Sequence, residues 1–437
     1  QALKCTVHYA QGGSKDCVIK ILRPDAEMKA RREFAIFNKA AQTVGHGMDV
    51  TFKGQFNSIL AELDLTNEAK NVEQGNTVYS HSKKDYNNTE VKQTYGSFEN
   101  VSSMKLAEGI PPSKNVMVLE EVTGTTMEQY LIDTRSRSQE VIAQAKNDIA
   151  ERGPENAPAV ALEGYNQLDK LYTDVKKKYE ALVNLSYMWV NEGLFAAGFY
   201  HGDIHKGNIM TQAGWKEGNP ENSPVTLIDF GNASSLNKKE RADVVKVVAG
   251  SATNDPALYL EGYKGLLSKN GLRTFESKKD EILNKLSVIF EKGTLRDTAA
   301  RMQAAIKILQ EDYSIEVPAA IHNFMESQRR LQNALDDTLS VMDDIAAQKK
   351  KLIAEYQNGY EDEEVKNSIV ERNTRADSYK PKNLMNAITD VVKQNLYAAM
   401  KSIGGARKAM QCYDKIRNDA DFQVEQQAPN GGHILAV

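Results

Sequence analysis

One polar stretch, residues 201–231, constrains what this chain can fold into more than any other part of the sequence. It opens with the run HGDIHKGNIM and closes with the run VTLIDFG. Inside it, residues 209–210 and 225–228 form two short apolar runs separated by a polar segment with Gly and Pro, the pattern of two strands joined by a hairpin connection. Such a pairing would bring Asn208 and Asp229, which lie far apart in the sequence, to the same end of two neighbouring strands.

Three polar residues in this stretch have the spacing of the kinase catalytic loop, H-x-D-x-x-x-x-N. They are His201, Asp203 and Asn208, and the later run Asp229-Phe230-Gly231 matches the DFG element. Phosphoryl transfer asks a protein mainly for positioning and for charge neutralisation around a nucleotide-bound metal. The match predicts that Asp203 meets the acceptor hydroxyl, while Asn208 and Asp229 bind Mg²⁺ against the phosphates of ATP. Each motif alone could be an acidic turn in an unrelated fold, but their order and strand context favour the site.

The loop HGDIHKGN departs from ordinary protein kinases, because Gly202 stands in place of Arg and a second histidine follows. It resembles the H-G-D-x-H-x-G-N loop shared by aminoglycoside and choline phosphotransferases and by the UbiB-type atypical kinases linked to coenzyme Q biosynthesis. The resemblance implies ATP and Mg²⁺ as cofactors. It also implies an α+β, two-lobed protein-kinase-like fold with a small β-rich N-lobe and a large, mainly helical C-lobe.

The start of the chain carries a candidate nucleotide lysine. Residues 3–10 and 16–22 have the pattern of two strands joined at Gly12-Gly13. The second strand contains VIKI, which resembles the V-A-I-K strand whose lysine pairs with the α- and β-phosphates and with a helix glutamate. A lysine on such a strand can equally be an exposed edge residue, but the catalytic loop downstream favours nucleotide binding by Lys20.

The next segment, residues 56–78, has the apolar periodicity of a helix. Its acids follow the pattern E-x-D…E-A-x-N, with Glu62, Asp64 and Glu68 at the acidic positions, and this pattern is similar to a helix signature of the UbiB family. The resemblance favours Glu68 as the ion-pair partner of Lys20 and places Glu62 and Asp64 near the phosphates. A solvated helix face is the alternative, above all for Glu62.

Further resemblance to the same family extends over much of residues 1–340. The run VMVLEEVTG at residues 116–124 resembles the strand and hinge that line the adenine pocket, so backbone groups of Glu120 and Val122 would bind the adenine edge. Two departures stand out: the helical extension with the K-x-G-Q motif is missing, and the chain begins at about the end of the alanine-rich loop. We therefore expect a chain truncated at the N-terminus.

The expected lobes are residues 1–123 and residues 124–437, with a charged surface insertion at 134–160. Apolar residues at helical spacing predict a buried helix over 165–197 that leads into the catalytic loop. Two lysine triplets, 176–178 and 349–351, are expected to be solvated faces. Further amphipathic helices are predicted at 279–291, 297–310, 319–356 and 383–413. They are expected to pack within the larger lobe, with a partner-binding bundle as the alternative.

Composition excludes several other classes. The 437 residues carry a net charge of -4, which gives no electrostatic case for nucleic acid. Three scattered cysteines favour a reducing compartment such as the cytoplasm over a disulfide framework. No apolar run is long enough to span a membrane, and no signal peptide opens the chain. Asn- and Lys-rich loops around an atypical kinase core would also suit a bacterial protein acting in a host cell.

Three functions remain open at the level of the sequence. The first is a phosphotransferase or ATPase of the UbiB type, with a protein, lipid or small molecule as the acceptor. The second is a small-molecule kinase of the aminoglycoside or choline type, which the E-x-D…E-A-x-N pattern disfavours. The third is a nucleotide-binding pseudokinase scaffold, which the presence of all the catalytic residue types disfavours.

Overall fold

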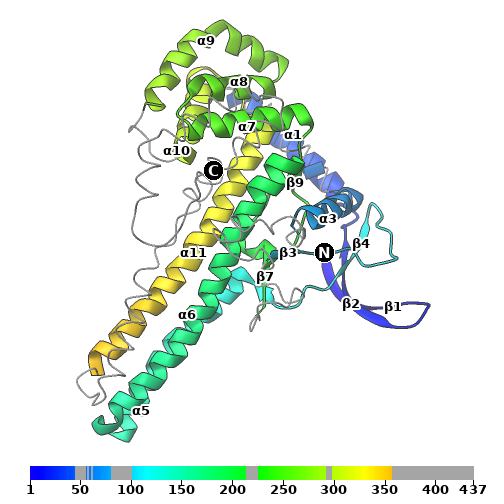
Figure 1. Cartoon of the computed structure of the whole chain (residues 1–437). Helices are drawn as coiled ribbons and strands as arrows, with labels where there is room; N and C mark the ends of the chain where they lie inside the picture. Colours follow the sequence, from blue (N-terminus) through cyan, green and yellow to red (C-terminus); the bar gives the residue numbers. More distant parts are fainter. Residues whose placement is uncertain are drawn as a thin grey trace.

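The computed structural model describes residues 1–44, 56, 59–60, 63–79, 101–212, 225–291 and 298–356. The fold is a mixed α+β architecture, mainly helical with small sheets. Small sheets and short helices from the first part of the chain lie beside two long helices, α6 and α11, which run along the molecule (Figure 1). A group of shorter helices, α7 to α10, lies at one end of that pair. Among the described helices, none is long and apolar enough to cross a lipid bilayer.

The first sheet places Lys20 on a central strand. It has three strands in the order β1-β2-β4, namely β1 (Ala2–His8), β2 (Ser14–Ile21) and β4 (Val116–Glu120). Both pairs are antiparallel, and Lys20 lies opposite Met117 of β4. The turn between β1 and β2 needs glycine, because Gly12 and Gly13 both have a φ of 93°. The hairpin predicted from the sequence is therefore confirmed.

Helix α3 (Leu65–Tyr79) starts later than the sequence pattern predicted. The expectation of one continuous helix over 56–78 is wrong, because Leu63 and Asp64 are not helical. Asp64 Oδ1 accepts hydrogen bonds from the Thr66 backbone N–H at 3.0 Å and from the Thr66 hydroxyl at 2.6 Å. A carboxylate in this position caps the first turn of a helix, and that cap starts α3 anew. The other long helix of this region is α1 (Ala26–Val44).

The catalytic-loop hairpin forms as predicted. Strands β7 (Ile209–Thr211) and β8 (Val225–Leu227) pair antiparallel, with Ile209 opposite Leu227. The Ile228 N–H continues the pairing by donating to the Asn208 carbonyl at 3.0 Å. This register puts Asn208 beside the residue that precedes Asp229. The sheet is completed by β3 (Val101–Ser103) and β5 (Thr125–Thr126), in the order β3-β8-β7-β5.

A three-helix arm runs along the molecule (Figure 1). It consists of α5 (Met127–Arg152), α6 (Ala157–Met188) and α11 (Ala319–Tyr356), with a 3₁₀ turn, η3 (Pro154–Asn156), between the first two. Residues 134–160, expected as a surface insertion, lie in α5, η3 and the first turn of α6. Helix α6 continues into a π-helix, η4 (Trp189–Ala197), which ends at Gly198 and leads into β6 (Phe199–His201), the strand that pairs with β9 (Ala233–Ser235). The buried helix predicted before the catalytic loop is thus present.

The arm buries two lysines that the sequence pattern had assigned to solvated faces. Lys178 and Lys349 are fully or almost fully buried, so the expectation is wrong at these two positions. Each ammonium group is neutralised by an aspartate of α6, Asp174 for Lys178 and Asp169 for Lys349. Each also lies over tyrosine rings: Tyr130 for Lys178, and Tyr165 and Tyr172 for Lys349. Paired charge and cation–π contact make burial of the ammonium group tolerable.

The remaining described helices are α7 (Lys238–Ala252), α8 (Pro256–Leu266), α9 (Lys269–Ile289), α10 (Thr298–Lys307) and the π-helical turn η7 (Ile308–Asp312). The helices predicted at 279–291, 297–310 and 319–356 correspond to parts of α9, to α10 with η7, and to α11. The helix predicted at 383–413 lies outside the described residues.

One tight contact joins α3 to the core around the DFG element. Gly75 of α3 faces the ring of Phe230, and a Cβ at position 75 would stand 2.2 Å from Phe230 Cε1. Phe230 is fully buried and packs near the rings of Tyr79, Phe199 and His201. Because protein cores are close-packed, this ring cannot move without disturbing its neighbours.

Replacing Gly75 by alanine should therefore destabilise the protein, although alanine is the better helix former by about 1 kcal/mol. We expect the free energy of unfolding to fall by about 1–3 kcal/mol, the usual effect of overpacking, as measured by denaturant titration. Glu73→Ala on the exposed side of the same helix is the matched control and should change stability by less than about 0.5 kcal/mol. A more stable Gly75→Ala variant would show that helix propensity, and not the Phe230 contact, decides at this position.

Candidate active site

Lys20 joins three distant segments of the chain through two ion pairs. Its Nζ lies 2.7 Å from Glu68 Oε1 and 3.0 Å from Asp229 Oδ1. The two carboxylates stand 48 and 209 positions away in the sequence. Strand β2, helix α3 and the turn after β8 therefore meet at one ammonium group, and the structure pairs Lys20 with the glutamate that the family resemblance favoured.

The charges of this triad are set by burial and by each other. Glu68 is 2% exposed, and burial, with the nearby Asp229 charge, raises its pKa to about 7 although the Lys20 charge works in the other direction. For Lys20, burial disfavours the charged form, but the Asp229 and Glu68 carboxylates outweigh it and raise its pKa. For Asp229, burial opposes ionisation, and the Lys20 ammonium still lowers its pKa. Lys20 and Asp229 are thus the firmly charged members.

Asp229 has a left-handed backbone, with a φ of 60°, a conformation that aspartate tolerates better than most residues. The turn is held locally, because the Gly231 N–H donates to Asp229 Oδ1 at 3.3 Å. The Asn71 side-chain amide donates to the Phe230 carbonyl at 3.0 Å. Glu68 and Asn71, one helical turn apart in the E-A-x-N run, therefore both hold the DFG segment, one through Lys20 and one directly.

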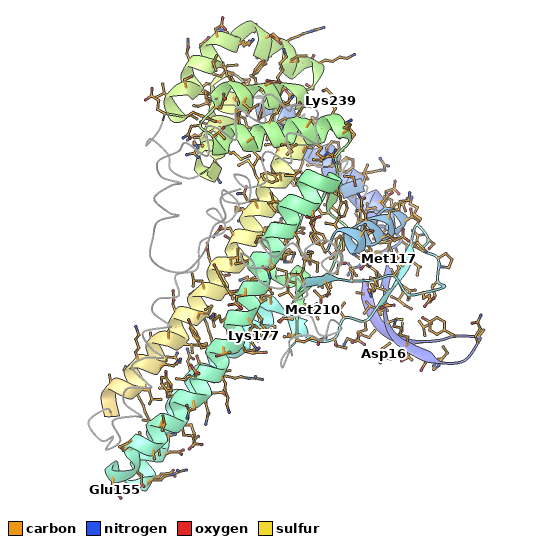
Figure 2. All side chains as sticks on the ribbon, viewed as in Figure 1. Asp16, Met117, Glu155, Lys177, Met210 and Lys239 are labelled. Atoms are coloured by element: carbon orange, nitrogen blue, oxygen red, sulfur yellow. The ribbon has the colours of Figure 1, made fainter. Side chains whose placement is uncertain are left out.

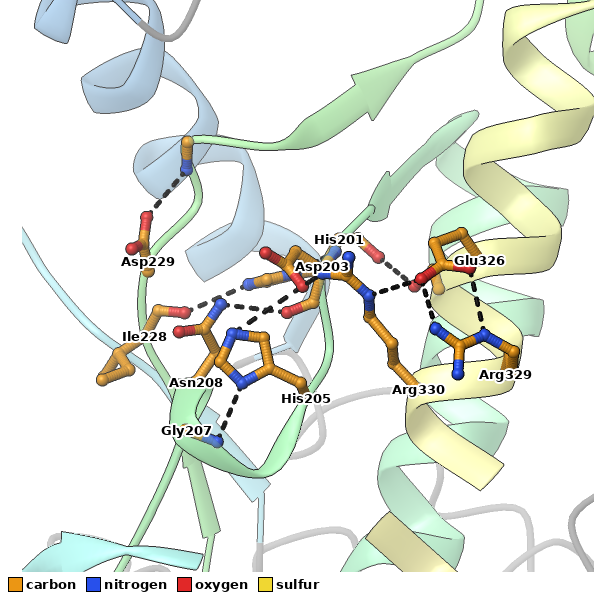
Figure 3. Close-up of polar contacts among 12 residues, drawn as sticks. His201, Asp203, His205, Gly207, Asn208, Ile228, Asp229, Glu326, Arg329 and Arg330 are labelled. Carbon is orange, nitrogen blue, oxygen red and sulfur yellow. Dashed lines mark hydrogen bonds and ion pairs between the residues drawn. The ribbon is translucent and has the colours of Figure 1, made fainter. Parts of the chain in front are cut away.

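His201 organises the catalytic loop from inside the core. Its side chain is fully buried, and burial lowers its pKa to about 4, so the ring is neutral near pH 7. Nδ1 accepts the Asp203 backbone N–H at 3.1 Å, which leaves the ring proton on Nε2. Nε2 then donates to the Ile228 carbonyl at 3.1 Å. The histidine thereby ties the loop to the strand end before Asp229, as Figure 3 shows.

Asn208 is held so that its amide oxygen is the group available to a metal. Its side-chain NH₂ donates to the Asp203 carbonyl at 3.0 Å, and the residue is 8% exposed. The β7–β8 register carries it to the same strand ends as Asp229. Within the part of the chain that the structure describes, no three His, Cys, Asp or Glu side chains cluster as a metal site. Two oxygen ligands suit Mg²⁺ that also binds phosphate and water, as it does with nucleotides.

The Asp203 side chain of the catalytic loop lies beside Arg330 of α11 (Figure 3). Its Oδ1 contacts the guanidinium of Arg330 and lies 3.8 Å from His205 Nε2. Arg330 was missed at the level of the sequence. It lies in an amphipathic helix far from the loop, and no local pattern connects the two segments.

The other predicted site residues lie as follows. The Glu120 side chain binds Lys15, with Oε1 2.6 Å from Nζ. This agrees with the hinge prediction, which involves only the backbone groups of Glu120. The Glu120 N–H donates to the Lys105 carbonyl at 2.9 Å, which leaves its carbonyl for an adenine contact. Val122 follows β4 in the connection to β5. Asp64 caps α3, and Glu62 lies outside the described residues.

Residues 160–261 match the family model described as ABC1 atypical kinase-like domain. This part of the chain is similar to the ABC1 atypical kinase-like domain. This is the domain of the UbiB-type kinases, so the resemblance found in the sequence is confirmed. The match begins in α6 and extends through the catalytic loop, the β7–β8 hairpin and the DFG element into α8. Lys20 and Glu68 lie before its start.

The solved structures that are similar to this chain include the complex of Rv3197 with erythromycin from Mycobacterium tuberculosis. The identity is 14%, the match covers 77% of this chain and 71% of that chain, and the TM-score is 0.32. A similarity of this degree carries no weight for function. No curated protein matches the sequence of the chain.

The Lys20–Glu68 pair can be tested by its effect on nucleotide affinity. Lys20→Ala should weaken ATP binding strongly and Glu68→Gln less, and the double variant should be no worse than Lys20→Ala. This non-additivity corresponds to a coupling free energy of about 1–3 kcal/mol between the two residues. It is measured by calorimetric titration of ATP into wild type, the two single variants and the double variant. The control is Lys15→Ala, on the same strand as Lys20. It breaks only the exposed ion pair between Lys15 and Glu120, so this variant should bind ATP normally. Additive effects of Lys20 and Glu68, or coupling of Lys20 to Glu62 instead, would contradict the assignment.

Proposed function

We propose that the protein is an ATP- and Mg²⁺-dependent phosphotransferase or ATPase of the UbiB-like atypical kinase type. The observation that carries the proposal is the contact of Lys20 with both Glu68 and Asp229. Active kinases need a strand lysine paired with a helix glutamate and a DFG aspartate placed to hold Mg²⁺, and here one ammonium group brings these two carboxylates together. The acceptor is a protein, a lipid or a small molecule.

The finer description of the fold belongs to the same proposal. Residues 1–123 would form the nucleotide lobe of a two-lobed kinase-like fold, and residues 124–437 the helical lobe, with 134–160 as an insertion in it. The antiparallel sheet of β1, β2 and β4 beside α3 supports the first lobe. The catalytic loop between η4 and the β7–β8 hairpin, surrounded by helices, supports the second.

In this proposal ATP lies between the sheet and the catalytic loop. Lys20 would bind the α- and β-phosphates, and the backbone of Glu120 and Val122 would contact the adenine edge. Glu62 and Asp64 would lie near the phosphates. One carboxylate oxygen of Asp64 is already used for the helix cap, so only its second oxygen can serve a ligand.

The hard oxygen ligands of Asn208 and Asp229 fit Mg²⁺. When bound, the ion would neutralise charge on the phosphates. Asp229 would hold it and Asn208 would complete the protein ligands with its amide oxygen. Asp203 would accept the proton of the acceptor hydroxyl, or orient that hydroxyl, as it attacks the terminal phosphorus.

We also propose a reducing compartment as the place of action, since Cys5 and Cys17 are free thiols. The low net charge argues against nucleic acid as a partner. A partner protein on the C-terminal helices stays an alternative use of that half of the chain.

The two aspartates should fail in different ways when each is changed to asparagine. Asp229→Asn removes a negative charge from the metal site, so Mg²⁺-dependent ATP affinity and turnover should both fall. Asp203→Asn leaves the metal ligands in place, so affinity should be nearly kept while turnover falls on the order of 10²- to 10⁴-fold. The measurements are calorimetric ATP binding with and without Mg²⁺, and ATP consumption with water, lipids, proteins, aminoglycosides and choline as acceptors.

The same measurements separate the competing functions. Normal turnover by Asp203→Asn with every acceptor would contradict its catalytic role, and binding without turnover in wild type would favour the pseudokinase. Phosphorylation of choline or an aminoglycoside would favour the small-molecule kinase. If Asp229→Asn bound Mg²⁺ and ATP as well as wild type does, the DFG assignment would be wrong.

A further inference from the structure

Helix α11 contacts the catalytic loop at several points. The Ser327 hydroxyl donates to the His201 carbonyl at 2.7 Å, and the Tyr200 hydroxyl donates to the Ala320 carbonyl at 3.0 Å. Further along the loop, Lys206 forms an ion pair with Asp337. Residues on three successive parts of α11 thus fix the loop from the side opposite Lys20 and α3, although this helix lies outside the segment that matches the ABC1 domain.

One further contact of α11 involves the proposed catalytic carboxylate itself, because Arg330 contacts Asp203. The guanidinium Nη1 forms an ion pair with Asp203 Oδ1, and this oxygen is buried and accepts no hydrogen bond from the described residues. The Asp203 side chain as a whole is nevertheless 24% exposed. Oδ1 is therefore closed to an incoming hydroxyl, and Oδ2 is the carboxylate oxygen that remains to serve it.

Arg330 is itself held in place before any ligand binds. Its Nε donates to Glu326 Oε1 at 3.0 Å, one helical turn earlier on α11. Arg329 binds the same glutamate through two contacts, at 2.6 and 3.1 Å, but the structure places it outside the Asp203 contact (Figure 3). A guanidinium fixed by a neighbouring carboxylate loses little further freedom when it binds a second one.

We propose that Arg330 is a positioning residue for phosphoryl transfer, which orients the Asp203 carboxylate by binding Oδ1 and so presents Oδ2 to the acceptor. This inference rests on the proposed function of Asp203. It makes α11 part of the reaction site, because a base that can rotate freely reacts in few of its orientations, and small errors in placement reduce rates strongly. A block of Asp203 by Arg330 would require both carboxylate oxygens to be covered, whereas the Asp203 side chain keeps 24% of its surface exposed.

The test compares Arg330→Ala, Arg330→Lys and Arg329→Ala in the full chain. Arg330→Ala should lower the turnover of ATP on the order of 10- to 100-fold and leave the dissociation constant of Mg·ATP within about 2-fold, a split that general loss of folding would not give. Arg330→Lys keeps the charge and should recover part of the rate. Arg329→Ala removes the other partner of Glu326 without touching Asp203 and should keep wild-type turnover.

A second measurement does not depend on turnover. The unfolding equilibrium constants of wild type, Arg330→Ala, Asp203→Asn and the double variant should show coupling of roughly 5-fold or more. Additive effects would overturn the inference, whether or not any acceptor is found.

The outcomes for the two proposals differ. If Asp203→Asn loses turnover while Arg330→Ala keeps it, Asp203 acts without Arg330 and the inference is wrong. Faster turnover by Arg330→Ala would also overturn it, because Arg330 would then block the site. If Asp203→Asn keeps wild-type turnover, the proposed function of Asp203 fails instead, and the unfolding cycle still decides whether Arg330 orients it.

Discussion

The arrangement of the site depends on a buried glutamate that cannot be left alone. Glu68 is almost completely removed from water, and an isolated carboxylate in such a place would take up a proton or unfold its surroundings. The Lys20 ammonium offsets part of this cost, in an arrangement where β2 is the central strand, α3 lies beside it, and the turn after β8 brings Asp229 to the same ammonium group. The contacts of one ammonium group thus fix the relative placement of three segments.

The buried residues behind this triad connect the DFG turn to the catalytic loop. Phe230 is surrounded by aromatic rings and by the close approach of Gly75, while Asn71 holds its carbonyl. The neutral ring of His201 lies against Phe230 and bonds both to the Asp203 N–H and to the Ile228 carbonyl. A shift of the DFG turn would therefore disturb the loop that carries Asp203, and α11 opposes such a shift from the other side.

Much of this could be predicted from the sequence, because local patterns determine local structure. Alternation and turn residues predicted the β1–β2 hairpin and the β7–β8 pair, and helical periodicity predicted α11 with its observed start. The start of α3 was mispredicted, because apolar spacing ran through Asp64 while a side-chain cap decides where the helix begins. The burial of Lys178 and Lys349 and the contact of Arg330 with Asp203 were missed for another reason. Each depends on which helices become neighbours, and that information lies in the topology and not in the residues flanking each position.

The central claim is that Lys20 faces the phosphates of ATP, and an ATP analogue with an acyl group on its terminal phosphate tests it most directly. Such a reagent transfers the acyl group to a lysine amine near the phosphates, and mass spectrometry identifies the modified residue without any knowledge of the acceptor. We expect Lys20 to be modified, ATP with Mg²⁺ to protect it, and Lys15 on the same strand to show no protection by ATP. Protected labelling of a different lysine, with Lys20 unmodified, would contradict the account.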